Sequence, residues 1–169
     1  MSFISSESKG ALNAGFFLAH EECVRETRTM PASGDLVTTT DDGAKYIKAG
    51  LAYPSNDGNA IGIVYEDVDV ATGAMPGPVV TKGVVVEDRL PITGQSYSAV
   101  TPVGTENPSK KGWYEKDGNV YTLSTDTEVD SEKTYYEVSG VVRLSSAAKT
   151  ALEAKGFKFV TEAEVTRPY

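Results

Sequence analysis

Cysteine and histidine are nearly absent from this chain of 169 residues, which contains one of each, Cys23 and His20. A single cysteine excludes a disulfide within the chain, although small secreted domains usually need such cross-links. We therefore expect synthesis in a reducing cytoplasm. Zinc sites take three or four ligands at repeated spacings, so the run HEEC at residues 20–23 predicts no metal site. No oxyanion-type motif accompanies Cys23, so a nucleophilic role is not predicted either.

Positive charge and long apolar runs are also scarce. The chain has 16 Lys and Arg against 24 Asp and Glu, which gives a net charge of −8. The basic cluster is limited to Lys110 and Lys111, so the composition predicts no contact with nucleic acid and no attraction to anionic membranes. The apolar run GFFLA at residues 15–19 is too short to cross a membrane or to form a signal-peptide core. We expect a soluble protein.

Turn residues, by contrast, are plentiful, with 16 Gly and 8 Pro, and they favour a mainly β fold. Residues 60–70 (AIGIVYEDVDV) and 77–87 (GPVVTKGVVVE) are rich in Val and Ile and are joined by a Gly/Pro turn. They predict two buried strands. Residues 36–40 (LVTTT) and 44–50 (AKYIKAG) flank an Asp-Gly turn, which predicts a β-hairpin.

Residues 1–34 contain few β-branched residues and are expected to form an N-terminal arm whose deletion leaves a folded domain. Within the arm, residues 15–29 are either a short helix or an extended segment laid on a neighbouring surface, and the pattern leaves both open. Phe16, Phe17 and Leu18 would cause aggregation if exposed, so this subunit or another is expected to cover them. We predict a capsid or oligomer interface there.

Residues 97–139 hold the only tryptophan and most of the tyrosines. Three short strands separated by polar turns are predicted, at 112–116, 119–124 and 133–139. The block predicts an inserted β-module within a β-rich domain of residues 35–96 and 140–169. Its aromatic side chains either form the module core, with Trp113 largely buried, or a platform that stacks on sugars. These side chains are Trp113, Tyr114, Tyr121, Tyr135 and Tyr136.

The C-terminal region predicts the one clear α-helix. Ser145 or Ser146 can cap a helix over AAKTALEAK, which Gly156 ends. A strand, FKFV, follows at residues 157–160, and residues 161–169 are expected to be a surface tail. The predicted fold class is therefore mainly β with one short C-terminal helix.

Carboxylates follow one another at Glu66, Asp67 and Asp69. Asp67 and Asp69 could act as acid and base or bind Ca²⁺, which would make the chain a hydrolase or a calcium protein. Asp69, however, stands at a strand exit, where Asp commonly caps a turn. Structural or interface roles fit Glu66, Asp67 and Arg89 better. No phosphate-binding loop is present, and no cofactor is predicted.

Four motifs occur in a fixed order: AG-x-x-Y-P-x-N-D-G-x-A-x-G-I-V-Y-E-D-V-D-V, G-P-V-V-x-x-G-x-V, R-L-P and SSAAKTALEAKGFKFV. Together they resemble the head decoration and head fibre proteins of tailed bacteriophages, over residues 45–91 and 141–160. The pattern NP-x-x-x-GWYEK-x-G-x-x-Y-x-L-x-x-D-T-x-V-x-x-x-K-T-YYE, from Asn107, is similar to a small β-module of phage tail and head appendage proteins.

The resemblance implies a virion structural protein without enzymatic activity. Such a protein is made in the host cytoplasm and coats the outer capsid surface at junctions between major capsid subunits. Its partners would be the major capsid protein and further copies of itself, as a homotrimer, with no nucleic acid, membrane or cofactor. The alternative is a carbohydrate or host-surface adhesion module that binds a glycan through the aromatic insertion.

Overall fold

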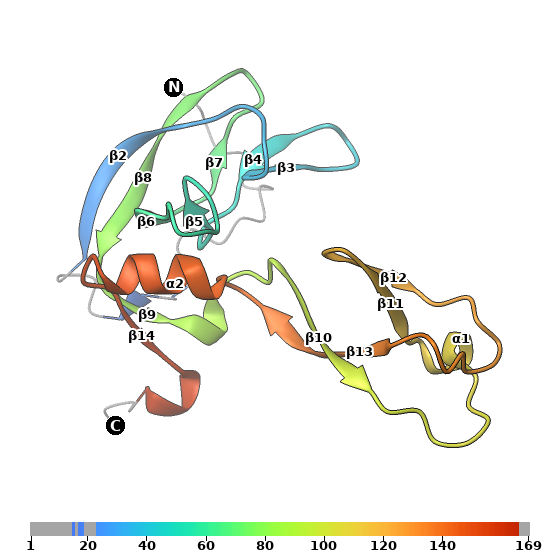
Figure 1. Cartoon of the computed structure of the whole chain (residues 1–169). Coiled ribbons are helices and arrows are strands. Elements are labelled where there is room, and N and C mark those ends of the chain that lie inside the picture. Colours follow the sequence, from blue (N-terminus) through green and yellow to red (C-terminus); the bar gives the residue numbers. More distant parts are fainter. Residues whose placement is uncertain (1–14, 16, 19–22, 166–169) are drawn as a thin grey trace. The chain divides into compact units, whose positions relative to one another are not determined.

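The chain folds into two compact units in the computed structural model, which describes residues 15, 17–18 and 23–165. The first unit comprises the residues up to Pro91 and those from Arg143 onward, and the second comprises residues 92–142 (Figure 1). The second unit is thus an insertion in the sequence of the first. It extends beyond the predicted boundaries of 97 and 139 because its strands β10 and β13 pair as far as Gly94 and Val142.

The larger sheet of the first unit is antiparallel, with the order β2-β8-β6-β5. Strands β6 and β8 approach each other closely at Gly62, where a Cβ atom would lie 2.4 Å from the carbonyl oxygen of Val80. Only glycine fits at such a backbone contact. The strand bounds are β2 Val24–Met30, β5 Ala52–Tyr53, β6 Gly62–Val64 and β8 Met75–Lys82.

Two smaller sheets complete the β-structure of this unit, with the orders β3-β4-β7 and β1-β9-β14. The predicted hairpin over residues 36–50 is confirmed, because β3 and β4 pair antiparallel. The two long strands predicted at 60–70 and 77–87 are each divided between two sheets, as β6 and β7 and as β8 and β9. The bounds are β1 Phe17–Leu18, β3 Val37–Thr39, β4 Lys45–Ile47, β7 Val68–Asp69, β9 Val84–Val86 and β14 Lys158–Val160.

The larger sheet has a core on each face, because successive strand residues point to opposite sides. Ile63 and Val80 pack with Leu152 of helix α2 (Ser146–Glu153), whereas Val64 and Val79 pack with residues such as Met30 and Ile47 in a second cluster. Figure 1 shows α2 between the larger sheet and the β9–β14 pair. The predicted helix is confirmed, with Ser145 Oγ accepting the Ala148 N–H at 3.0 Å.

The predicted arm of residues 1–34 is wrong for its second half. Residues 24–30 are extended, but they lie on the chain's own sheet, where β2 pairs with β8 over its whole length. Met30 is fully buried in the core. Phe17 and Leu18 form β1 and pair with β9 of the same chain, whereas Phe16 and residues 19–22 lie outside the described residues.

The second unit is one antiparallel sheet with the order β10-β13-β11-β12. The three predicted strands are present, and β10 adds a fourth that was not predicted. A single helical turn, α1, is capped by Asn107 and ends at Gly112 with a φ of +70°. The mainly β fold class is confirmed. The bounds in the second unit are β10 Gly94–Val100, α1 Pro108–Lys111, β11 Tyr114–Asp117, β12 Val120–Leu123 and β13 Tyr135–Val142.

The first unit also contains two short 3-10 helices, η2 Glu87–Arg89 and η3 Glu162–Glu164.

Candidate functional site

The second unit separates its aromatic side chains onto two faces of the sheet. Trp113 and Tyr135 are 5 % and 0 % exposed, and their ring centroids lie 5.8 Å apart. The predicted burial of Trp113 is therefore confirmed. Tyr114, Tyr121 and Tyr136 lie on the opposite face, because Tyr114 pairs with Tyr136 and neighbouring strand residues alternate. The five aromatic residues thus do not form one platform.

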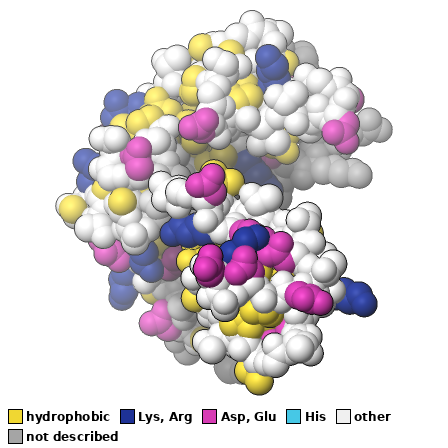
Figure 2. All heavy atoms as spheres, turned by 45° about the vertical axis from the view of Figure 1, so that its right-hand side comes forward, with side chains coloured by type: hydrophobic (Ala, Val, Ile, Leu, Met, Phe, Trp, Pro, Cys, Tyr) yellow, Lys and Arg dark blue, Asp and Glu magenta, His cyan; other side chains and the backbone are white. Residues whose placement is uncertain are grey.

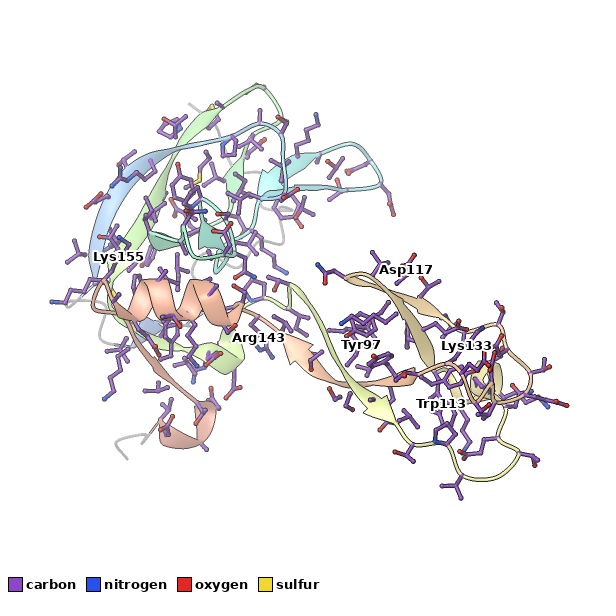
Figure 3. The ribbon with its side chains drawn as sticks, viewed as in Figure 1. Tyr97, Trp113, Asp117, Lys133, Arg143 and Lys155 are labelled. Atoms are coloured by element: carbon purple, nitrogen blue, oxygen red, sulfur yellow. The ribbon has the colours of Figure 1, made fainter. Side chains whose placement is uncertain are left out.

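A polar network accompanies the buried pair of rings. The Tyr135 hydroxyl donates to Asp126 Oδ2 at 2.7 Å and accepts the Asp130 N–H at 3.1 Å. Lys133 Nζ lies 2.8 Å from Asp126 Oδ2 and 3.0 Å from Glu115 Oε2. Every member has a partner of complementary charge or hydrogen-bonding type, so the network holds the loop of residues 124–133 against the sheet. Figure 3 shows Lys133 and Trp113 in this part of the unit.

The charges in this network stabilise one another. The hydrogen bond from Lys133, with a smaller contribution from Tyr135, lowers the pKa of Asp126. The hydrogen bond to Asp126, followed by that to Glu115, raises the pKa of Lys133. Burial raises the pKa of the Tyr135 hydroxyl. All three shifts keep each group in its usual charge state at neutral pH, which suits a structural role better than proton transfer.

We expect the second unit to lose stability in acid because of Asp126. Its pKa is lowered in the folded chain, so its contribution is complete above the unfolded value of about 4 and is lost as the pH falls through the folded value. Glu106 acts in the same direction, since the Val103 N–H and then Lys111 lower its pKa. Trp113, the only tryptophan, reports the melting of this unit by fluorescence.

The midpoint of the Trp113 melt should stay level from about pH 8 to pH 5 and fall below about pH 4. Asp126→Asn should lower it at neutral pH and flatten the acid dependence. The matched control is Asp117→Asn, an exposed carboxylate on β11 of the same sheet, which should leave the pH profile unchanged. Equal profiles for Asp126→Asn and the wild-type chain would contradict this assignment.

Four tyrosines pack together on the other face of the sheet and form what we call the tyrosine cluster. The rings of Tyr97 and Tyr121 are stacked with centroids 4.0 Å apart. Tyr97 also meets Tyr114 edge-on at 5.0 Å, and Tyr121 meets Tyr136 at 5.2 Å. Two strands separate β10 from β12 in the sheet order, so this contact requires the sheet to curl toward the cluster.

One pair of rings in the tyrosine cluster, Tyr97 and Tyr121, is stacked face to face, and the other two ring contacts are edge-on. Lys116 Nζ lies 5.5 Å from the centroid of Tyr121, and the Tyr97 hydroxyl donates to Gln95 Oε1 at 3.1 Å. Figure 3 places Tyr97 apart from Trp113. Tyr97 was not among the predicted aromatic site residues. The alternation of polar and apolar residues at 96–99 (Ser-Tyr-Ser-Ala) is a weak signal that could have indicated its strand.

The predicted interface residues of the first unit make contacts within the chain. Asp67 Oδ1 accepts the Ala49 N–H at 2.7 Å, and Glu66 is half-buried. Arg89 binds both carboxylate oxygens of Glu162 at 2.7 Å and donates to the carbonyl of Gly15. The hydrogen bond with Glu162 raises the pKa of Arg89. A role of these residues in contacts with another subunit stays a prediction.

The paired carboxylates Asp67 and Asp69 are placed as structural groups. Asp69 Oδ1 accepts the Ala71 N–H at 2.8 Å, which confirms the predicted turn cap.

Among residues 23–165 and the few described before them, no three His, Cys, Asp or Glu side chains are grouped as metal ligands. In the same residues no helix is long and apolar enough to cross a membrane. On the face drawn in Figure 2, acidic and basic side chains are interspersed.

Comparison with known proteins found no match to this chain among family models, curated proteins or solved structures.

Proposed function

We propose that the chain is a virion structural protein that binds the outer surface of a tailed-phage capsid as a decoration or head fibre protein. One observation carries the proposal. The segments that resemble decoration proteins, residues 45–91 and 141–160, share one hydrophobic core, in which Ile63 and Val80 pack with Leu144 and Leu152. The block between them, which resembles an appendage module, forms the second unit.

The two units have separate tasks in this proposal. The first unit contacts the major capsid protein at subunit junctions, as a homotrimer, and its predicted contact residues are Phe16, Phe17 and Leu18 together with Glu66, Asp67 and Arg89. The second unit is the projecting appendage. A protein that bridges several capsid subunits binds through several modest contacts at once, because each contact raises the effective concentration of the protein at the next contact site. A net charge of −8 suits the outer surface better than the DNA-filled interior.

Cosedimentation with capsids tests the proposal. The full chain is mixed with capsids of the encoding phage that lack it, and the pellet and the particle surface are examined by gel and by electron microscopy. We expect saturable binding at fixed positions. A variant with residues 92–142 replaced by a short Gly/Ser linker should bind equally well, because the capsid contacts belong to the first unit. A full chain that stays in the supernatant at saturating concentration would overturn the proposal.

The alternative, adhesion to a glycan, has weaker support from the geometry. Two of its five predicted stacking residues, Trp113 and Tyr135, are in the core of the second unit. The remaining three belong to the tyrosine cluster, where Tyr121 is stacked on Tyr97 and Tyr114 and Tyr136 make edge-on contacts. Sugar sites need a few well-placed polar groups beside an open ring, and Gln95 already accepts the Tyr97 hydroxyl here.

A further inference from the structure

Strand β10 forms an open edge of the sheet in the second unit. It pairs with β13 over Gly94–Val100, and no other strand of the described residues pairs with it. Its outer row of N–H and C=O groups is therefore available along seven residues. An edge of this kind is a template for an added strand.

β10 also lacks the features by which proteins protect such an edge. No residue from Ile92 to Thr105 is charged, and β10 contains no proline. The one irregularity of the ladder lies in β13, where Ser139 is skipped between the pairs of Ser96 and Tyr97. The outer edge of β10 stays regular as a result. Charges, prolines and bulges are the usual means of preventing edge pairing.

The other long edge strand of the chain provides an internal comparison. Strand β2 also has seven residues and forms an edge of the larger sheet. It carries three charged side chains, Arg25, Glu26 and Arg28, and all three are exposed. The chain therefore protects one of its long edges and leaves the other uncharged.

The ribbon behind the open edge exposes two valines and is only two strands wide. Val138 and Val141 of β13 are 43 % and 52 % exposed. Strand β11 pairs with β13 only at Tyr135 and Tyr136, so beyond that point β10 and β13 form a two-stranded ribbon. Two-stranded ribbons are only marginally stable in water, and a third strand stabilises them.

We propose that β10 pairs antiparallel with β10 of a second copy of this chain. The charge distribution favours this occupant over other strands. Each copy carries a net charge of −8, so most approaches of two copies bring carboxylates together. At this edge neither β10 carries a charge, and the one carboxylate of the ribbon, Glu137, lies one strand further back, opposite Ser98, so two copies meet here with few like charges. An antiparallel pair of identical strands has the two-fold symmetry of the commonest self-contacts.

The contact is weak by itself. A seven-residue strand is roughly 23 Å long, and one added ladder lies at the low end of the area that specific interfaces bury, below about 1,200 Å². We expect association in solution only at high micromolar concentration, and much stronger pairing where copies are held close together. The inference does not rest on capsid binding, because the pairing is measured in free protein. If the first unit forms trimers, the β10 contact links one trimer to the next.

Amide hydrogen exchange of the full chain at two concentrations tests the pairing. At about 500 μM, compared with about 5 μM, the outward-facing amides of residues 94–100 should exchange several-fold more slowly, while those of β2 and β12 are unchanged. The double variant Ser98→Lys, Ala99→Lys places charge at two exposed positions of the edge and should abolish the concentration dependence. Thr122→Lys, at an exposed position on the opposite edge strand, is the matched control and should behave like the wild-type chain.

Sedimentation equilibrium measures the same step as an association constant. The double variant should associate at least tenfold more weakly than the wild-type chain and Thr122→Lys, and Trp113 fluorescence checks that its second unit is folded. Several results overturn the proposal: no association step at about 500 μM, equal association of the double variant and the control, or protection that appears at β2 or β12 instead of β10.

Discussion

Replacing Trp113 with alanine is expected to unfold the second unit and leave the first unit folded. The Trp113 side chain is 5 % exposed and packs on Tyr135. Its backbone also joins α1 to the end of β12, since its N–H donates to Pro108 and its carbonyl accepts the Ser124 N–H. Truncation of a buried tryptophan removes about 3–5 kcal/mol of stability. A unit of this size has only roughly 3–8 kcal/mol in total, so the loss is comparable to the whole.

Hydrogen exchange read peptide by peptide separates the two units in this experiment. In Trp113→Ala, amides of β11, β12 and β13 should lose protection, whereas those of β8 and α2 should keep theirs. Trp113→Phe should show an intermediate loss because it keeps a ring against Tyr135. Val103→Ala, at a side chain 78 % exposed, should change little. Simultaneous loss of protection in both units would show that they unfold as one and contradict the prediction.

The features that could be predicted from the sequence depend on neighbouring residues. The cap at Ser145 and the stop at Gly156 define α2 within one short segment, and the Asp-Gly turn at 42–43 defines the β3–β4 hairpin. The same holds for β11 and β12, which a turn at 117–119 joins. Trp113 follows from composition, because a small β-unit with one tryptophan needs it in its core.

The features that were missed depend on pairing between distant segments. Residues 24–30 gave no strand signal of their own, and β2 exists because it pairs with β8, whose residues lie between 45 (Met30 to Met75) and 58 (Val24 to Lys82) positions further along the chain. β10 is likewise paired through β13. The breaks in the runs 60–70 and 77–87 arise where each run passes from one sheet into another. A single-sequence pattern cannot distinguish this from one long buried strand.

The division of the aromatic residues is a consequence of register. Tyr135 and Tyr136 are neighbouring residues of the same type, yet Tyr135 is fully buried against Trp113 and Tyr136 belongs to the tyrosine cluster. Alternation predicts that they lie on opposite faces, but it does not say which face is covered. The covering loop of residues 124–133 decides this, because Asp126 and Lys133 fix it over Tyr135.

Removing residues 1–30 is expected to unfold the first unit, in contrast to the folded core that the sequence predicted after deletion of residues 1–34. The deletion removes β2, which pairs with β8 along seven residues, and it removes Met30 from a core that also contains Val64 and Val79. Loss of a buried methionine side chain alone lowers stability by about 2–5 kcal/mol. The lost ladder also exposes to water the β8 backbone groups that faced β2, whereas those that face β6 keep their partners.

Two truncations distinguish this result from a general effect of shortening the chain. Deletion of residues 1–30 should abolish the cooperative melt of the first unit, while Trp113 fluorescence still reports a folded second unit. Deletion of residues 1–14 removes no described strand and should keep both transitions. A cooperative melt of the first unit after deletion of residues 1–30 would show that β2 is dispensable. If the chain binds capsids as proposed, a loss of binding can be attributed to the N-terminal residues only in the shorter deletion, because in the longer one the first unit is unfolded.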